Sequence, residues 1–109
     1  MTRKEAQEAG HKVATGKFSF GANGRAMSLG ETEGFVRVVI DKDSEVILGF
    51  EAVGPEVSNL IAEGGLALEM GALATDVGWT IHAHPTLSEV LMEAANAALG
   101  QAVHAVNRK

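Results

Sequence analysis

Two apolar runs joined by a short polar segment constrain the fold of this chain more than any other feature. Residues 35–40, Phe-Val-Arg-Val-Val-Ile, are rich in the β-branched side chains that favour strands. Residues 41–44, Asp-Lys-Asp-Ser, are typical of a turn. Residues 45–53 then alternate, and the apolar positions on one face are Val46, Leu48, Phe50 and Ala52. The pattern predicts a β-hairpin with one buried face.

The residues before the hairpin predict a short helix and a further strand. Polar residues 2–9 are compatible with one or two helical turns, and residues 11–20 alternate as a strand does. Residues 21–24, Gly-Ala-Asn-Gly, signal a turn. The pattern of residues 25–29 fits a helical turn or the entry to a strand, and it does not decide between them.

The residues after the hairpin predict helices. Apolar side chains at helical spacing indicate a helix that starts near Pro55 and ends at Gly71. Thr75 is positioned to cap a short helix, and a last long helix ends at Gly100. Because strands precede helices, the predicted class is α+β, with a mainly antiparallel sheet and helices packed on one side.

The composition excludes several classes of function. A length of 109 residues predicts one domain, and the absence of cysteine excludes a disulfide or a cysteine-ligated metal within it. The net charge is −5, and no basic stretch with interleaved aromatic residues indicates nucleic acid. No apolar run approaches the roughly 20 residues that span a bilayer. The first residues lack the apolar segment of a signal peptide. We expect a cytoplasmic location, or the mitochondrial matrix in a eukaryote.

One stretch has the side chains needed for proton transfer. Residues 81–89 read Ile-His-Ala-His-Pro-Thr-Leu-Ser-Glu. Pro85 disfavours a helical backbone at His84, and Thr86 with Glu89 matches a Thr-x-x-Glu capping box. The stretch therefore predicts an imidazole just outside a helix N-terminus and a carboxylate in the first turn. Such a pair can accept and donate protons near neutral pH.

This stretch resembles the C-terminal signature of the pyridine nucleotide–disulfide oxidoreductases, and its form is most similar to that of the dihydrolipoamide dehydrogenases. The resemblance implies an α+β interface domain in a homodimer, with His84 as the acid/base of thiol–disulfide exchange and Glu89 orienting it. It also implies a cis bond between His84 and Pro85, and contact of both residues with the FAD of the other subunit. The resemblance covers nearly the whole chain. Its less specific matches occur in the order expected for the family, at residues 22–26, 34–36, 47–49 and 53–55.

The resemblance implies FAD and NAD as cofactors of a longer parent that joins 2-oxo acid dehydrogenase complexes. This chain has neither a redox cysteine pair nor a Gly-x-Gly-x-x-Gly turn after a strand for a dinucleotide. We therefore interpret residues 1–109 as one dimerisation domain from a longer flavoenzyme, inactive and without cofactor when alone. Two alternatives stay open. One is the same domain of a glutathione-type reductase, although His82-Ala83 before His84 favours the dihydrolipoamide dehydrogenases. The other is a free-standing dimerisation or adaptor module without a catalytic role.

Several other residues have simpler interpretations. Closing the capping box is an alternative explanation for Glu89. We expect a supporting or structural role for His82, because two histidines without a third ligand are weak evidence for a metal, and we predict no metal site. We expect packing for Trp79 and assign no role to His11 or His104.

The last two long helices carry more apolar side chains than a small sheet readily covers. Surplus apolar area tends to be buried between subunits, and most soluble homo-oligomers close as two-fold pairs. We therefore predict a two-fold dimer. The side chains that motivate the prediction are Leu60, Ile61, Leu68, Leu87, Leu91 and Met92.

Overall fold

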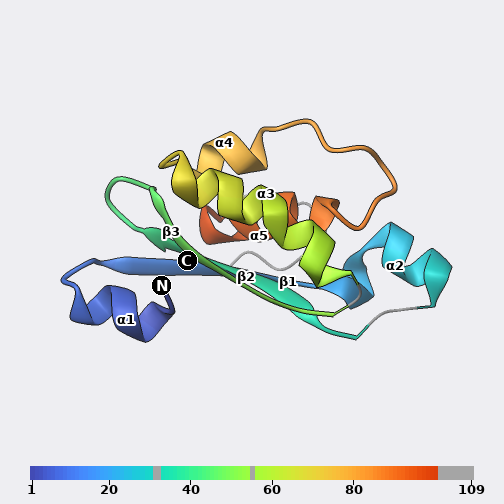
Figure 1. The fold of residues 1–109 in the computed structure, drawn as a ribbon, viewed down its shortest axis with the longest axis horizontal. Coiled ribbons are helices and arrows are strands. Elements are labelled where there is room, and N and C mark those ends of the chain that lie inside the picture. The colour runs from blue at the N-terminus through green and yellow to red at the C-terminus, as the bar shows by residue number, and fades with distance from the viewer. Residues whose placement is uncertain (31–32, 55, 101–109) are drawn as a thin grey trace.

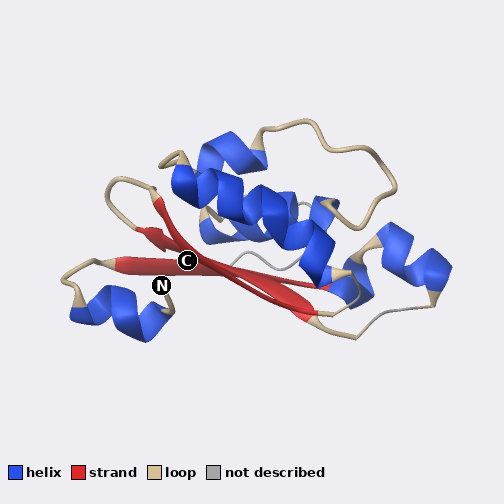
Figure 2. Ribbon diagram, in the orientation of Figure 1, coloured by secondary structure: helices blue, strands red, loops and turns tan. Residues whose placement is uncertain are grey.

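A three-stranded antiparallel sheet forms the middle of the molecule in the computed structural model, which describes residues 1–30, 33–54 and 56–100 (Figures 1 and 2). Its strands lie in the order β1 (Val13–Ser19), β2 (Phe35–Asp41) and β3 (Ile47–Val53). Both pairings are antiparallel, and β2 with β3 forms the predicted hairpin. The strand predicted before the hairpin is β1, the third strand of the sheet.

Helices cover one face of this sheet, as predicted, and a short helix lies against the other (Figure 1). The covering helices are α3 (Val57–Glu69), α4 (Ala74–Gly78) and α5 (Glu89–Ala98), while α1 (Arg3–Glu8) is the short one. A single 3-10 turn (Phe20–Ala22) and α2 (Gly24–Leu29) follow β1. The undecided segment 25–29 is thus helical, and the predicted α+β class is confirmed.

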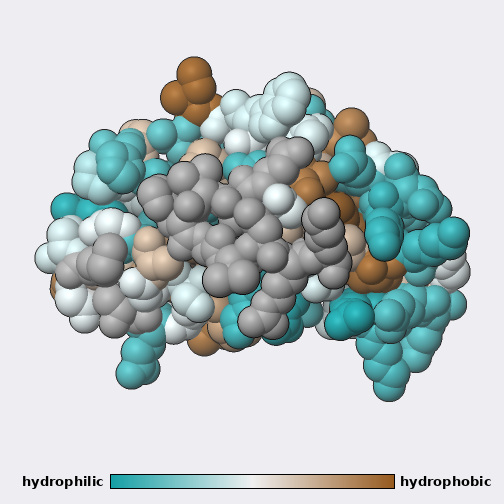
Figure 3. Space-filling view, turned by 180° about the vertical axis from the view of Figure 1, so that it is seen from behind, coloured by the Kyte–Doolittle hydropathy of each residue, from teal (hydrophilic) through white to brown (hydrophobic). Residues whose placement is uncertain are grey.

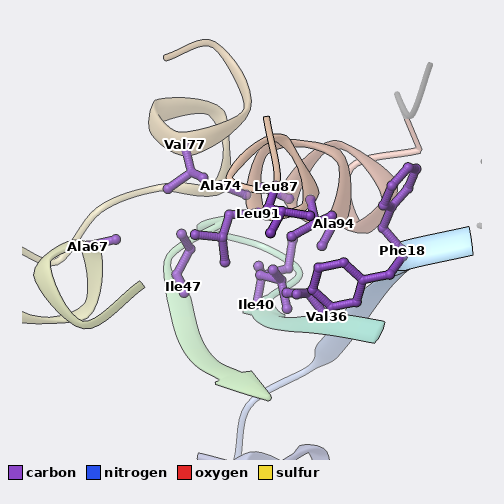
Figure 4. Close-up of a cluster of buried hydrophobic side chains, with 14 of the residues drawn as sticks. Phe18, Val36, Ile40, Ile47, Ala67, Ala74, Val77, Leu87, Leu91 and Ala94 are labelled. Carbon is purple, nitrogen blue, oxygen red and sulfur yellow. The ribbon is translucent and has the colours of Figure 1, made fainter. Parts of the chain in front are cut away.

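The core lies between the sheet and α5, with α3 and α4 closing its side (Figure 4). Phe18 and Val36 from the sheet meet Leu91 and other apolar side chains from α5, and all three are at most 1% exposed. α5 also approaches the backbone of β1 closely at Gly16. A β-carbon there would lie 2.8 Å from the carbonyl carbon of Ala97 and overlap the neighbouring backbone atoms. Only glycine leaves enough room for this contact.

A β-bulge changes which residues of β3 face the core. Val39 pairs with Gly49, but the next residue of β2 pairs with Ile47, so Leu48 is an extra residue in the ladder. An extra residue reverses the alternation of side chains. Ile47 is consequently in the core at 3% exposure, on the same face as Phe50 and Ala52. The prediction was therefore right for residues 50 and 52 and wrong for residues 46 and 48.

The predicted ends of both long helices are confirmed. Gly71 follows α3 with φ of 64°, and Gly100 follows α5 with φ of 76°, a left-handed conformation that glycine adopts at little cost. Thr75, however, does not cap the short helix. That helix begins one residue earlier, and the Leu73 N–H before it donates to the Asp76 carboxylate at 2.8 Å. α3 begins at Val57, close to the start predicted near Pro55. Pro55 itself and the tail after residue 100 lie outside the described residues.

The surface carries hydrophilic side chains around α1 and separate hydrophobic groups elsewhere (Figure 3). Trp79, for which we expected packing, is 74% exposed because it ends α4 where the chain leaves the helical layer. Leu87 and Leu91, which we counted as surplus apolar area, instead lie in the core at 7% and 1% exposure. Across the described ranges, no helix is both long and apolar enough to cross a membrane.

Candidate active site

The candidate site lies where the loop after α4 enters α5. Nδ1 of His84 is 3.0 Å from both carboxylate oxygens of Glu89, the first residue of α5. The His84 side chain is 71% exposed, whereas that of Glu89 is only 12% exposed. The bond between His84 and Pro85 is cis, as the resemblance implied. The site thus presents an accessible imidazole on a sheltered carboxylate.

The two explanations that the sequence left open for Glu89 are compatible in this geometry. Its Oε1 contacts His84 and also accepts the Thr86 N–H at 2.9 Å. The capping box is only half formed, because the Thr86 hydroxyl donates to the Ala83 carbonyl at 2.6 Å instead of to the helix. Ser88, not Thr86, is the residue that flanks the first turn of α5.

The carboxylate selects one protonation pattern of the His84 ring. An ionised carboxylate can only accept hydrogen bonds, so Nδ1 of His84 is the nitrogen that carries hydrogen toward Glu89. In the described part of the chain no hydrogen bond engages Nε2, and this nitrogen is left to accept a proton. Once protonated, the same nitrogen can return the proton, as a general acid does.

Asn23 supports the site from the far end of the sequence. This side chain is 4% exposed and spans two segments of the fold. Its Nδ2 donates to the carbonyl of Thr86 at 3.0 Å, and its Oδ1 accepts the N–H of Ala26 at 2.8 Å. Asn23 and His84 both line a pocket of about 140 Å³. The sequence signalled only a turn here, although an asparagine before a helical segment is a capping signal that could have identified the second bond.

The supporting or structural role that we expected for His82 stays a prediction, and the structure shows a buried side chain with two contacts. Its side chain is 5% exposed, with Nε2 2.7 Å from Oε2 of Glu63 and Nδ1 2.8 Å from the carbonyl oxygen of Thr80. Glu63 was not singled out in the sequence, because it lies on α3, 19 residues away. Within residues 1–30, 33–54 and 56–100, no three His, Asp or Glu side chains converge as a metal site requires.

His11 takes part in a separate ion pair at the hairpin turn. Its Nδ1 is 2.7 Å from Oδ2 of Asp41. The backbone N–H of Ser44 and the His11 ring lower the pKa of Asp41 to about 2. This pair holds the β1 entry against the turn and does not belong to the candidate site. His104 lies outside the described residues.

Solved structures identify the fold. LpdA from Mycobacterium tuberculosis matches with a TM-score of 0.80 and 23% identity, over 88% of this chain and 21% of that one. The HOCl-induced flavoprotein disulfide reductase RclA from Escherichia coli matches with a TM-score of 0.82 and 22% identity, over 88% of this chain and 22% of that one. At these identities the likeness concerns the fold alone.

The class follows from a family model whose match covers residues 1–95. The chain belongs to the family described as "Pyridine nucleotide-disulphide oxidoreductase, dimerisation domain". Within that family its sequence is similar to those of dihydrolipoyl dehydrogenases. It is 55% identical to the dihydrolipoyl dehydrogenase of Thermus scotoductus and 54% identical to that of Haloferax volcanii, in each case over 99% of this chain and 23% of the relative. The chain therefore spans less than a quarter of the length of these relatives.

Proposed function

We propose that this chain is the interface domain of a longer dihydrolipoyl dehydrogenase, in which His84 is the general acid/base for the dithiol substrate. The observation that carries the proposal is the pairing of an accessible His84 ring with the sheltered carboxylate of Glu89 at 3.0 Å. The sequence relatives support the substrate class, since they are dihydrolipoyl dehydrogenases.

Each residue of the pair has a distinct role in this proposal. Nε2 of His84 takes the proton from a dihydrolipoamide thiol, and the resulting thiolate attacks a disulfide on the partner subunit. Glu89 holds the ring by its Nδ1–H and stabilises the imidazolium that forms, as a third group does in a catalytic triad. The reverse transfer returns the proton from Nε2 when the substrate disulfide is reduced.

The parent would require FAD and NAD, whose chemistry is electron transfer from the reduced disulfide to nicotinamide. The exposure of His84 and Pro85 fits a place against the partner's FAD. The described part of this chain offers no dinucleotide turn, and its sequence offers no cysteine. We therefore expect no oxidation of NADH by the purified 109-residue chain with added FAD and an artificial acceptor. Measurable NADH oxidation in that assay would contradict this part of the proposal.

Substitution of His84 in the full-length parent tests the acid/base role. We expect His84→Gln to slow lipoamide turnover by about 10²–10⁴-fold, the typical worth of general acid/base catalysis. Electron transfer from NADH to an artificial acceptor should persist, because that half of the reaction needs no substrate thiol. Glu89→Gln should do less damage, since it removes an orienting charge but leaves the base.

A control is available at a histidine–carboxylate pair away from the site. His11→Gln removes the 2.7 Å contact with Asp41, which lies at the hairpin turn. This variant should retain both lipoamide and artificial-acceptor activity. Wild-type lipoamide kinetics in His84→Gln would refute the role of His84.

The parent's association as a homodimer belongs to the same proposal. Among the described residues on and after α3, four large apolar residues are at least 60% exposed: Leu66, Met70, Trp79 and Ile81, at 60%, 75%, 74% and 96%. A partner subunit can cover such a group. Sedimentation equilibrium of the 109-residue chain should show two-fold association at micromolar to millimolar concentration. A strictly monomeric chain over that range would refute self-association of the isolated domain.

A further inference from the structure

The loop that carries His84 has no regular structure of its own between α4 and α5. Ile81 on this loop is 96% exposed, and the His84 side chain is 71% exposed. Proton transfer requires a group placed to within a fraction of an ångström, and a misplacement of 1 Å can cost about 10²-fold in rate. Glu89 holds the ring of His84 and the N–H of Thr86, so the rest of the backbone around His84 needs other restraints.

Two buried side chains hold this backbone on either side of His84. Before it, His82 inserts into the fold at 5% side-chain exposure and reaches Glu63 on α3 at 2.7 Å. After it, Asn23 donates to the carbonyl of Thr86 at 3.0 Å. The loop is thereby attached to α3 at one end and to the β1–α2 junction at the other.

Each of these two side chains is held in one orientation by contacts at both of its polar ends. Both ring nitrogens of His82 face acceptors, the Thr80 carbonyl and the Glu63 carboxylate. The Thr80 carbonyl can only accept a hydrogen bond, so Nδ1 is its donor, and the Glu63 carboxyl group then holds Nε2 on the opposite side of the ring. Rotating the Asn23 amide by half a turn would break both of its hydrogen bonds, because its oxygen accepts the Ala26 N–H and its nitrogen donates to the Thr86 carbonyl.

We propose that Asn23 and the His82–Glu63 pair are positioning residues for His84. They fix the loop on both sides of the imidazole and so determine where Nε2 meets the substrate thiol. The inference rests on the proposed acid/base role of His84, and none of the three side chains is assigned contact with substrate. The competing explanation is that these bonds only contribute to the stability of the domain.

Two variants of the full-length parent remove the attachments with little change of shape. Asn23→Ser keeps a short oxygen that caps α2 but loses the donor to Thr86. Glu63→Ala removes the acceptor for His82, and Glu63→Gln restores an oxygen without the charge. His11→Gln is again the matched control, because it breaks a 2.7 Å histidine–carboxylate contact away from the loop.

The expected result is specific to the thiol step. Asn23→Ser and Glu63→Ala should each lower the kcat for lipoamide about 10- to 100-fold, with KM changed much less and transfer from NADH to an artificial acceptor unchanged. Glu63→Gln should recover most of the loss. Residues that act through one group are non-additive, so neither variant should slow lipoamide turnover further in a His84→Gln background.

Three outcomes are decisive. Wild-type kcat in both single variants, with His84→Gln impaired, overturns the positioning role and leaves the acid/base role intact. A loss that is equal for lipoamide and the artificial acceptor, or that persists beside His84→Gln, overturns it in favour of general destabilisation. Full activity of His84→Gln overturns the proposed function itself. Should Asn23→Ser not fold, Glu63→Ala decides, since its side chain is 33% exposed.

Discussion

Two glycine-to-alanine substitutions should have opposite effects on stability, because the surroundings of Gly16 and Gly65 differ. At Gly16, an added β-carbon would lie 2.8 Å from the Ala97 carbonyl carbon and closer still to backbone atoms of Ala94 and Ala98. These are backbone atoms, so no side chain can rotate to make room. At Gly65 in α3, an added β-carbon has no neighbour within 4 Å. The same chemical change therefore meets a clash at one site and open space at the other.

The magnitudes follow from these surroundings. Overpacking of an interior typically costs about 1–3 kcal/mol, and we expect Gly16→Ala near 3 kcal/mol because α5 itself must move. At about 4–8 °C per kcal/mol for a domain of this size, the melting temperature should fall by roughly 12 °C or more. Gly65→Ala should instead stabilise by about 0.5–1 kcal/mol, because glycine is unfavourable inside a helix.

Urea unfolding of the 109-residue chain, followed by far-ultraviolet circular dichroism, measures both effects. The slopes of the two variants should match that of the unsubstituted chain, so that a shifted midpoint reports stability alone. An unchanged midpoint for Gly16→Ala would show that α5 does not rest on the strand as described. A loss of similar size in Gly65→Ala would refute the reasoning from local space altogether.

Two further predictions concern the core and the hairpin turn. Leu91→Ala should destabilise the chain by about 2–5 kcal/mol, because it leaves a cavity beneath α5 where the side chain is 1% exposed; thermal unfolding measures this, and an effect below about 1 kcal/mol would argue against a packed interior there. Asp41 has a folded-state pKa of about 2, below its ordinary 3.8, so its contribution is fully present above pH 3.8 and is lost as the pH falls through 2. Unfolding midpoints should therefore show that Asp41→Asn is less stable than the unsubstituted chain at pH 6 and that the difference shrinks toward pH 2. A difference that stays constant with pH would contradict the lowered pKa of Asp41.

Local patterns were sufficient for most of the secondary structure and for the His84–Glu89 pair of the candidate site. The hairpin and the two long helices follow from periodicities within single segments. His84 and Glu89 are five residues apart across the start of a helix, so their contact was also within reach of the sequence. The bulge was not, because Ile47 and Leu48 are both apolar and fit either register equally well.

The supporting contacts depend on how separate elements pack, and residue spacing carries no signal for them. Asn23 and Thr86 are 63 residues apart, and Glu63 and His82 are 19 apart on different elements. Trp79 illustrates the converse error, since a large aromatic side chain normally indicates packing, yet it is 74% exposed in this chain. Burial depends on what the fold brings opposite a side chain, which a one-dimensional pattern does not contain.

The bulge at Leu48 makes this strand tolerant of one particular change in length. Ile47 and Phe50 face the same side of the sheet only because one residue between them lies outside the ladder. Deleting Leu48 would turn β3 into a regular strand and leave both side chains on the core face, because only Gly49 would then lie between them and residues two positions apart share a face. Deleting Ala52 instead would bring Val53 to the inward position at the strand end. Homologues one residue shorter at Leu48 can therefore share this core, and a gap placed there marks an insertion in the strand rather than a different fold.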